Sequence, residues 1–109
     1  MKLSSVTTEL INFFENNKSH LPNGMQKAFL FGCFARGDAR VGSDADVALV
    51  AKDTWKIEQR NIARDWLEGF DAHLSVSPFF TTENKLLRTT DKFDANYWIA
   101  REGILLWEK

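Results

Sequence analysis

The chain has 109 residues and a formal net charge of -1, from 14 basic and 15 acidic side chains. Hydrophobic residues make up 44% and charged residues 27% of the sequence, which excludes an intrinsically disordered chain. The near-neutral charge lacks the polybasic signature of broad nucleic-acid binding, so nucleic acid is not an expected partner.

The first half of the sequence predicts two strands and two helices around a glycine turn. Apolar residues at helical spacing define the first helix, and short apolar runs define the strands. The expected elements are a helix from Ser4 or Ser5 to Asn16, a strand at residues 28–31 that stops at Gly32, a short helix at residues 34–40, and a second strand at residues 44–50. The second strand is acidic at its start and apolar afterwards, so we expect it to lie centrally in a sheet.

The second half of the sequence continues this alternation of helices and strands. We expect a helix capped by Asp53 or Thr54 and ended by Gly69, a strand at residues 71–76 stopped by Pro78, a short helix capped by Thr81 or Thr82, a helix at residues 94–101 closed by Gly103, and a terminal strand or extended tail at residues 104–107. Alternating strands and helices predict an α/β (α+β) fold in a single domain over residues 1–109. The segment between the first two strands is too short for a parallel crossover, so a small mixed sheet flanked by helices is expected.

Asp44 and Asp46 stand two residues apart at the start of the second strand. Residues i and i+2 of a strand face the same side, so both carboxylates project together. Like charges this close repel unless a cation neutralises them, and Mg²⁺ prefers carboxylates together with substrate phosphates. A solvated strand end with two ordinary surface acids is the commoner explanation of such a pair when it stands alone.

A glycine turn from Gly32 to Gly37 gives the acid pair a more specific context. Gly32 lacks a Cβ, so backbone amides there can approach an anion closely, and the free amides of the following helix can hold phosphate oxygens. Arg36 is placed to add further donors. Such a turn is weak evidence by itself, and it lacks the Gly-Lys-Ser ending of a P-loop.

Asp71 is a third candidate acid, at the start of the strand expected at residues 71–76. If that strand lies beside the second one, three carboxylates could hold two Mg²⁺ ions. A plain turn residue after Gly69 explains Asp71 equally well. The single cysteine, Cys33, excludes an internal disulfide, and there is no Cys/His cluster for zinc. No signal peptide or membrane-spanning stretch is recognisable, so a cytoplasmic protein is expected.

Two sequence segments together resemble a known signature. Residues 31–37, Phe-Gly-Cys-Phe-Ala-Arg-Gly, and residues 42–47, Gly-Ser-Asp-Ala-Asp-Val, are similar to the Gly-Ser-x-Ala-Arg-Gly and Ser-Asp-x-Asp motifs of the DNA polymerase β-like nucleotidyltransferase superfamily. The small size resembles its minimal nucleotidyltransferases, which are often the antitoxin partners of helical HEPN-domain toxins.

The resemblance implies a polymerase β-like fold and a Mg²⁺-dependent transfer of a nucleoside monophosphate from a triphosphate, ATP being the expected one, to a hydroxyl acceptor. The acceptor could lie on a HEPN toxin partner, in a homo- or hetero-oligomer. The implied residues are Asp44, Asp46 and Asp71 as catalytic metal ligands for two ions, and Gly32, Cys33, Arg36 and Ser43 as substrate-binding positions.

Cys33 departs from the family pattern, in which this position is a serine that contacts phosphate. A thiol is a weaker donor than a hydroxyl, which puts triphosphate affinity in doubt more than the fold. The alternative function is therefore a non-catalytic nucleotide-binding or toxin-neutralising module of the same fold. The sequence leaves both functions open.

Overall fold

The computed structural model describes residues 3–40, 42–70 and 75–109. In chain order its elements are α1 (Leu3–Asn16), a 3₁₀ turn η1 (Lys18–His20), β1 (Met25–Phe31), α2 (Cys33–Arg36), β2 (Ala45–Ala51), α3 (Ile57–Glu68), β3 (Val76–Thr82), α4 (Glu83–Arg88), α5 (Ala95–Glu102) and β4 (Ile104–Glu108). None of the described helices is long and apolar enough to cross a membrane.

The four strands form one mixed sheet in the order β3-β2-β1-β4. β1 is antiparallel to both β2 and β4, whereas β2 and β3 run parallel. The predicted mixed sheet and the central position of β2 are therefore confirmed. The chain end also forms a strand, β4, which resolves the choice between a strand and an extended tail.

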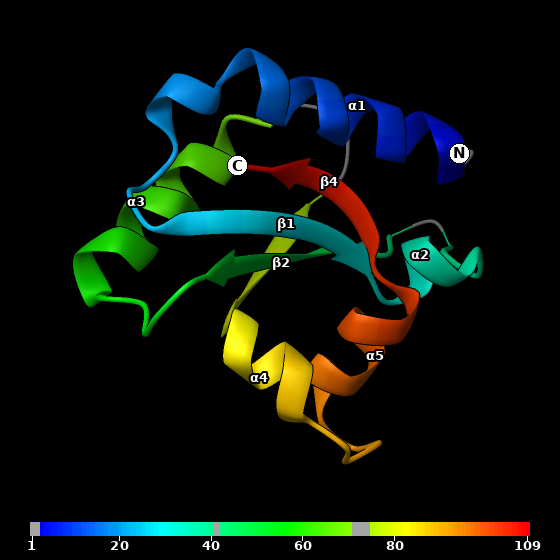
Figure 1. Ribbon diagram of the computed structural model, residues 1–109. Coiled ribbons are helices and arrows are strands. Elements are labelled where there is room, and N and C mark those ends of the chain that lie inside the picture. Colours follow the sequence, from blue (N-terminus) through cyan, green and yellow to red (C-terminus); the bar gives the residue numbers. More distant parts are fainter. Residues whose placement is uncertain (1–2, 41, 71–74) are drawn as a thin grey trace.

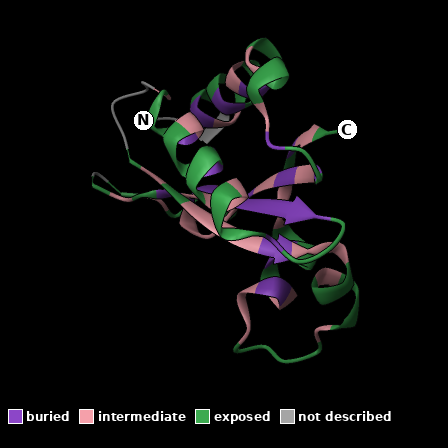
Figure 2. Ribbon diagram, turned by 90° about the vertical axis from the view of Figure 1, so that its left-hand side faces the viewer, coloured by how far each residue is buried: buried purple, intermediate pink, exposed green. Residues whose placement is uncertain are grey.

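Helices cover the two faces of the sheet unequally, with α1 and α3 on one face and α4 and α5 on the other (Figure 1). The main core lies under α1 and α3, and burial is concentrated there and in the central strands (Figure 2). It is formed by alternate strand residues and by helix residues at helical spacing, among them Leu10 and Phe14 of α1, Ala28 and Leu30 of β1, Val47 and Leu49 of β2, and Ala63 and Leu67 of α3.

Aromatic rings join α1 to α3 across this core. The ring of Trp66 lies 4.6 Å from that of Phe13 and 4.8 Å from that of Phe14, centroid to centroid. The indole N–H of Trp66 donates to the Asn17 carbonyl at 3.3 Å, at the end of α1. These contacts place α3 against α1, and so fix the helix that connects the parallel strands β2 and β3.

The strand predicted at residues 71–76 and stopped by Pro78 was placed wrongly. Residues 71–74 lie outside the described part of the chain, and β3 begins at Val76 and runs through Pro78 to Thr82. Among the described strands, β3 pairs only with β2 and is the edge of the sheet, where a residue without an N–H is tolerated. Proline therefore marks an edge strand here and does not end a strand.

Two predicted helix starts were also wrong. α1 begins at Leu3, so Ser4 and Ser5 lie inside the helix and do not precede it. α3 begins at Ile57. Its start is displaced from Asp53 and Thr54 because the next residue, Trp55, is buried and its indole N–H donates to the carbonyls of Leu49 and Thr81, at 3.1 and 2.9 Å.

Several predicted boundaries are confirmed. The helix caps at the carboxyl ends of α3 and α5 are Gly69 and Gly103. The hydroxyl of Thr82 accepts a hydrogen bond from the Lys85 amide at the start of α4. The helix predicted at residues 34–40 is shorter in the structure, because α2 ends at Arg36 and Gly37 caps it in a left-handed conformation.

Candidate functional site

The predicted acid pair lies where β2 begins. Asp44 is exposed and directly precedes the strand, and Asp46 is its second residue and is partly buried. The alternate residues Ala45 and Val47 point into the main core, so Asp46 faces the other side of the sheet. The chain thus places a carboxylate at the mouth of an otherwise apolar central strand.

Gly32 lies directly against Asp46. The β1–β2 register pairs Phe31 with Asp46, which brings the turn after β1 beside the start of β2. Gly32 has φ 77° and ψ -151°, a conformation open almost only to glycine. A Cβ at this position would collide with Oδ2 of Asp46. The glycine therefore permits both the shape of the turn and the close approach of the carboxylate.

The surroundings of Asp46 disfavour its charged form. Burial is the largest cause that raises the pKa of Asp46 above 3.8, and the negative charge of Asp44 raises it further. The positive charge of Arg36 acts in the opposite direction and lowers this pKa. Repulsion by Asp44 outweighs the nearby guanidinium, so the site carries negative charge that the protein itself does not fully compensate.

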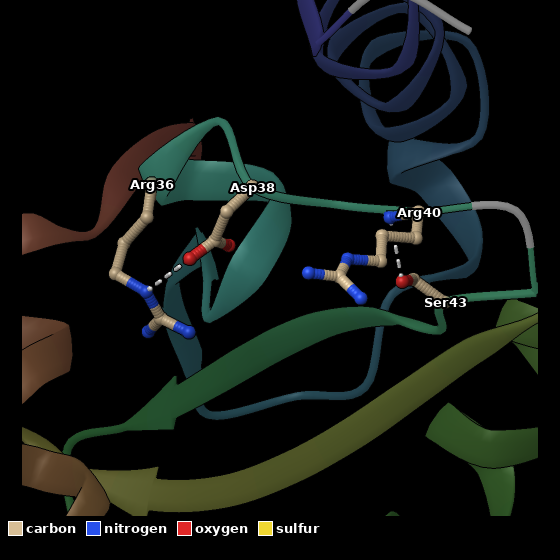
Figure 3. A network of polar contacts seen from close by, with 4 residues as sticks. All are labelled: Arg36, Asp38, Arg40 and Ser43. Carbon is tan, nitrogen blue, oxygen red and sulfur yellow. Dashed lines mark hydrogen bonds and ion pairs between the residues drawn. The ribbon is translucent and has the colours of Figure 1, made fainter.

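Arg36 lies at the end of α2, and Figure 3 shows its side chain beside that of Asp38. The Nε atom donates to Oδ2 of Asp38 at 3.4 Å, and both side chains are about half exposed. Exposed pairs of this kind contribute little to stability. Arg36 is consequently close enough to influence Asp46 and can exchange Asp38 for another anion at small cost.

Ser43 stabilises the loop that leads into β2 (Figure 3). Its hydroxyl accepts a hydrogen bond from the Arg40 amide at 2.9 Å, and its own amide donates to the Arg40 carbonyl at 2.9 Å. These reciprocal bonds close a turn immediately before Asp44. In this structure the Ser43 hydroxyl thus positions the acid pair through the backbone.

Cys33 is the first residue of α2 and directly follows Gly32. Its free thiol is partly buried and packs against the main core. The first backbone bond of the helix runs from the Arg36 amide to the Gly32 carbonyl at 3.0 Å, so the amides of residues 33–35 precede it. The turn predicted to hold phosphate therefore starts at the glycine that contacts Asp46.

Sequence reasoning missed Ser75 and Ser77 beside the acids. The β2–β3 register pairs Asp46 with Ser77, and the Ala45 amide donates to the Ser75 carbonyl at 2.9 Å. Both serines are exposed. The polar–apolar–polar alternation of residues 75–77 was the available signal, and the misplaced strand concealed it. Asp71 lies outside the described residues.

The site also has an apolar wall that the sequence did not predict. Phe31 of β1 and Phe79 of β3 face the same side of the sheet as Asp46, and their rings lie 5.8 Å apart, edge to face. They meet diagonally across β2, where Phe31 is paired with Asp46 and Phe79 with the small Ala48. The rings border the acid and explain part of its burial.

The carboxylates of Asp44 and Asp46 fit a hard divalent cation. Carboxylate oxygens are preferred by Mg²⁺, and the unfavourable proximity of Asp44 and Asp46 would be relieved by a bound cation. Within residues 3–40, 42–70 and 75–109, no group of three or more His, Cys, Asp or Glu side chains is arranged to hold a metal. Mg²⁺ held by two carboxylates would complete its coordination with water and substrate phosphates.

Solved structures share this arrangement of elements. A Sulfolobus solfataricus protein, provisionally assigned as a nucleotidyltransferase, is similar at 18% identity with a TM-score of 0.63, over 98% of this chain and 84% of that chain. A toxin–antitoxin structure with AMP-PNP matches at 20% identity with a TM-score of 0.57, over 94% and 73% of the two chains. A complex of the tri-AMPylated Shewanella oneidensis HEPN toxin with its MNT antitoxin matches at 17% identity with a TM-score of 0.52, over 98% and 73%.

The fold and the glycine–aspartate site together define a nucleotidyltransferase of the polymerase β-like class. The match extends to the sequence, because residues 8–109 fit the family described as Polymerase beta, Nucleotidyltransferase. The chain belongs to this family. A search of the curated proteins finds no match.

Proposed function

We propose that this chain transfers a nucleoside monophosphate from a nucleoside triphosphate to a hydroxyl group, with Mg²⁺ bound at the start of β2. The observation that carries the proposal is the contact between Gly32 and Asp46, supported by family membership. The hydroxyl oxygen forms a bond to the α-phosphorus, the bond to the leaving pyrophosphate breaks, and the hydroxyl proton passes to a base or to solvent.

Each site residue has a proposed role in this reaction. Asp44 and Asp46 hold Mg²⁺, with Asp71 as the proposed third acid for a second ion. The ion supplies neutralisation of the carboxylates and the triphosphate when it is bound. The turn at Gly32 and Cys33 orients the phosphates through backbone amides, Arg36 adds positive charge, and Ser43 positions the acid pair.

The acceptor is proposed to lie on a partner protein. The motivation is the small size of the domain: one four-stranded sheet with its helices leaves little surface to grip a separate small acceptor. A structural neighbour is a complex of an AMPylated HEPN toxin with an MNT antitoxin, which makes a helical HEPN toxin the partner of choice and ATP the triphosphate of choice.

The second candidate is a nucleotide-binding or toxin-neutralising module without catalysis. The observation that favours it is Cys33, because a partly buried thiol stands where the family uses a phosphate-contacting serine. Under this reading the chain would bind its partner tightly, and the acids would serve only to hold nucleotide and metal.

An intact-mass assay separates the two functions. The chain is incubated with a candidate HEPN-domain partner, Mg²⁺ and each triphosphate in turn, and the mass of the partner is measured by mass spectrometry. If the chain is an enzyme, the mass of the partner should increase by a nucleoside monophosphate. This increase should be absent with Asp44→Asn and Asp46→Asn. Asp65→Asn, an exposed carboxylate on α3, is the matched control and should retain transfer. Tight binding with unchanged toxin mass would establish the binding module instead.

A further inference from the structure

A cavity lies at the opposite end of the β2–β3 pair from the acids. It has a volume of ≈ 310 Å³ and is lined by residues 52–55, Arg60, residues 80–82, Asn84 and Lys85. This volume falls at the lower end of the range for small-molecule sites. Lys52 directly follows β2 and stands six positions after Asp46, which separates the cavity from the acids by about 20 Å at ~3.3 Å per residue.

The topology explains why a crevice forms there. β2 and β3 are parallel, so their carboxyl ends meet at the same edge of the sheet. After β2 the chain leads to α3, on one face of the sheet, and after β3 it leads to α4, on the other face (Figure 1). Ligands of open α/β sheets bind in crevices of this kind, outside the carboxyl ends of strands whose connections diverge.

Positive charge dominates the cavity lining. Lys52, Arg60 and Lys85 come from three separate segments of the chain, and among the described lining residues Asp53 is the single acidic one. In the described part of the chain, none of these three cations forms an ion pair. The local excess of positive charge contrasts with a net charge of -1 for the whole chain.

Arg60 supplies an independent indication of a missing acceptor. Its guanidinium carbon lies 5.7 Å from the centre of the Phe80 ring, which holds the side chain beside the cavity. Its Nε atom is buried, and among the described residues no hydrogen-bond partner accepts from it. A buried charged donor without an acceptor is costly and calls for an explanation such as a bound anion.

We propose that this cavity binds a phosphate group, either free phosphate or the phosphate of a mononucleotide. Convergence of one guanidinium and two ammonium groups suits an oxyanion with several acceptor oxygens and more than one negative charge better than a single carboxylate. The proposal does not depend on the transfer reaction, because no described residue of the acid site lines the cavity.

Backbone amide shifts of the full-length chain in two-dimensional ¹H–¹⁵N NMR spectra test the proposal. Sodium phosphate, AMP and sodium acetate are titrated separately at constant ionic strength. Phosphate should produce saturable shifts at residues 52–55 and 82–85. Equal or tighter AMP binding at the same amides identifies the mononucleotide as the source, and binding of phosphate alone identifies free phosphate. Acetate that binds as tightly as phosphate overturns the assignment.

Charge-matched variants separate a built site from general attraction. Lys85→Met removes an exposed cation of the cavity and should weaken phosphate binding about tenfold, the equivalent of one charged hydrogen bond. Lys92→Met makes the same charge change at an exposed position outside the cavity and should leave the affinity within about twofold. Shifts that do not saturate, or that weaken equally in both variants, would refute the site.

Discussion

The two ends of the parallel β2–β3 pair carry opposite and uncompensated charge. At the amino end Asp44 repels Asp46, and the nearby Arg36 only partly offsets this. At the carboxyl end Lys52 and Lys85 line a cavity without ion-pair partners in the described structure. One pair of strands thus has one end that favours cations and another end that favours anions.

At each end, the binding of a ligand is linked to the stability of the folded chain. Uncompensated like charges oppose folding, and a ligand of opposite charge that binds only the folded chain reverses that effect. Gly32, at the acidic end, has a backbone conformation that is open almost only to glycine. Arg60 adds an unpaired buried donor at the basic end. Bound ligands would therefore explain the features of both ends, whereas packing does not explain them.

The largest expected effect comes from a substitution at the acidic end. Asp46→Asn should lower the rate of nucleotide transfer to a partner by about 100- to 1,000-fold, because it removes a charge placed where the reacting phosphates must be neutralised. The rate is measured from the intact mass of the partner against time. Asp65→Asn, on α3, is the control and should stay within about twofold of the original rate. A transferring Asp46→Asn variant would place the chemistry elsewhere.

The next effect concerns the two turn glycines, which form a matched pair. Gly32→Ala should lower the free energy of unfolding by about 3 kcal/mol or more, because backbone strain adds to the collision with Asp46. Gly37→Ala should cost only about 1–2 kcal/mol, since Gly37 also has positive φ but no atom of the described residues lies within 4 Å of the added Cβ. Urea denaturation of both variants measures the difference.

A double variant identifies the cause of the Gly32 effect. Asp46→Ala removes the carboxylate that a Cβ on Gly32 would meet, so Gly32→Ala should be less harmful in that background. The remaining loss should approach that of Gly37→Ala. Equal losses for Gly32→Ala with and without the carboxylate would mean that the two residues do not contact each other in solution.

The acidic end was predictable from sequence because its parts are close together in the chain. Asp44 and Asp46 belong to one short segment, and the glycine turn is separated from them by a single loop. Strand periodicity predicted both carboxylates on one side, and in the structure the charge of Asp44 acts on Asp46. The mixed sheet followed similarly, from the short connection between residues 31 and 45.

The basic end was not predictable, since its residues come from distant segments. Lys52, Arg60 and Lys85 meet only after β3 has aligned parallel to β2, and periodicity carries no information on that register. The same dependence concealed Ser77 beside Asp46, because the strand was placed too early. Local patterns predicted elements, whereas contacts across the sheet required the structure.

A smaller effect is expected from a substitution in the glycine turn. Cys33→Ser replaces a weak donor by a hydroxyl and should tighten binding of a Mg²⁺-triphosphate by at most about 1.5–3 kcal/mol, the value of one hydrogen bond to a charged group. Titration calorimetry measures the affinity, and Cys33→Ala serves as the control without a donor. Weaker binding by the serine variant would mean that the turn is shaped around the sulfur atom, which packs against the core.

The smallest effect concerns how pH changes stability at the acidic end. Burial and the charge of Asp44 raise the pKa of Asp46 above 3.8 in the folded chain. The folded state therefore binds more protons than the unfolded state between the two pKa values, and stability falls as pH rises through this window. Asp46→Asn stays neutral, so it should be more stable than the original chain at about pH 7 and should lose that advantage at about pH 4.

Urea midpoints at both pH values measure this difference, with Asp65→Asn as the exposed-carboxylate control. Added Mg²⁺ should stabilise the original chain at neutral pH more than it stabilises Asp46→Asn, because a bound cation removes the repulsion that the substitution also removes. If Asp46→Asn is more stable than the original chain by the same amount at both pH values, the gain would have to arise from packing. A loss of stability at neutral pH would show that the ionised Asp46 carboxylate accepts favourable contacts, and the two ends of the strand pair would then differ in kind, with only the basic end awaiting a ligand.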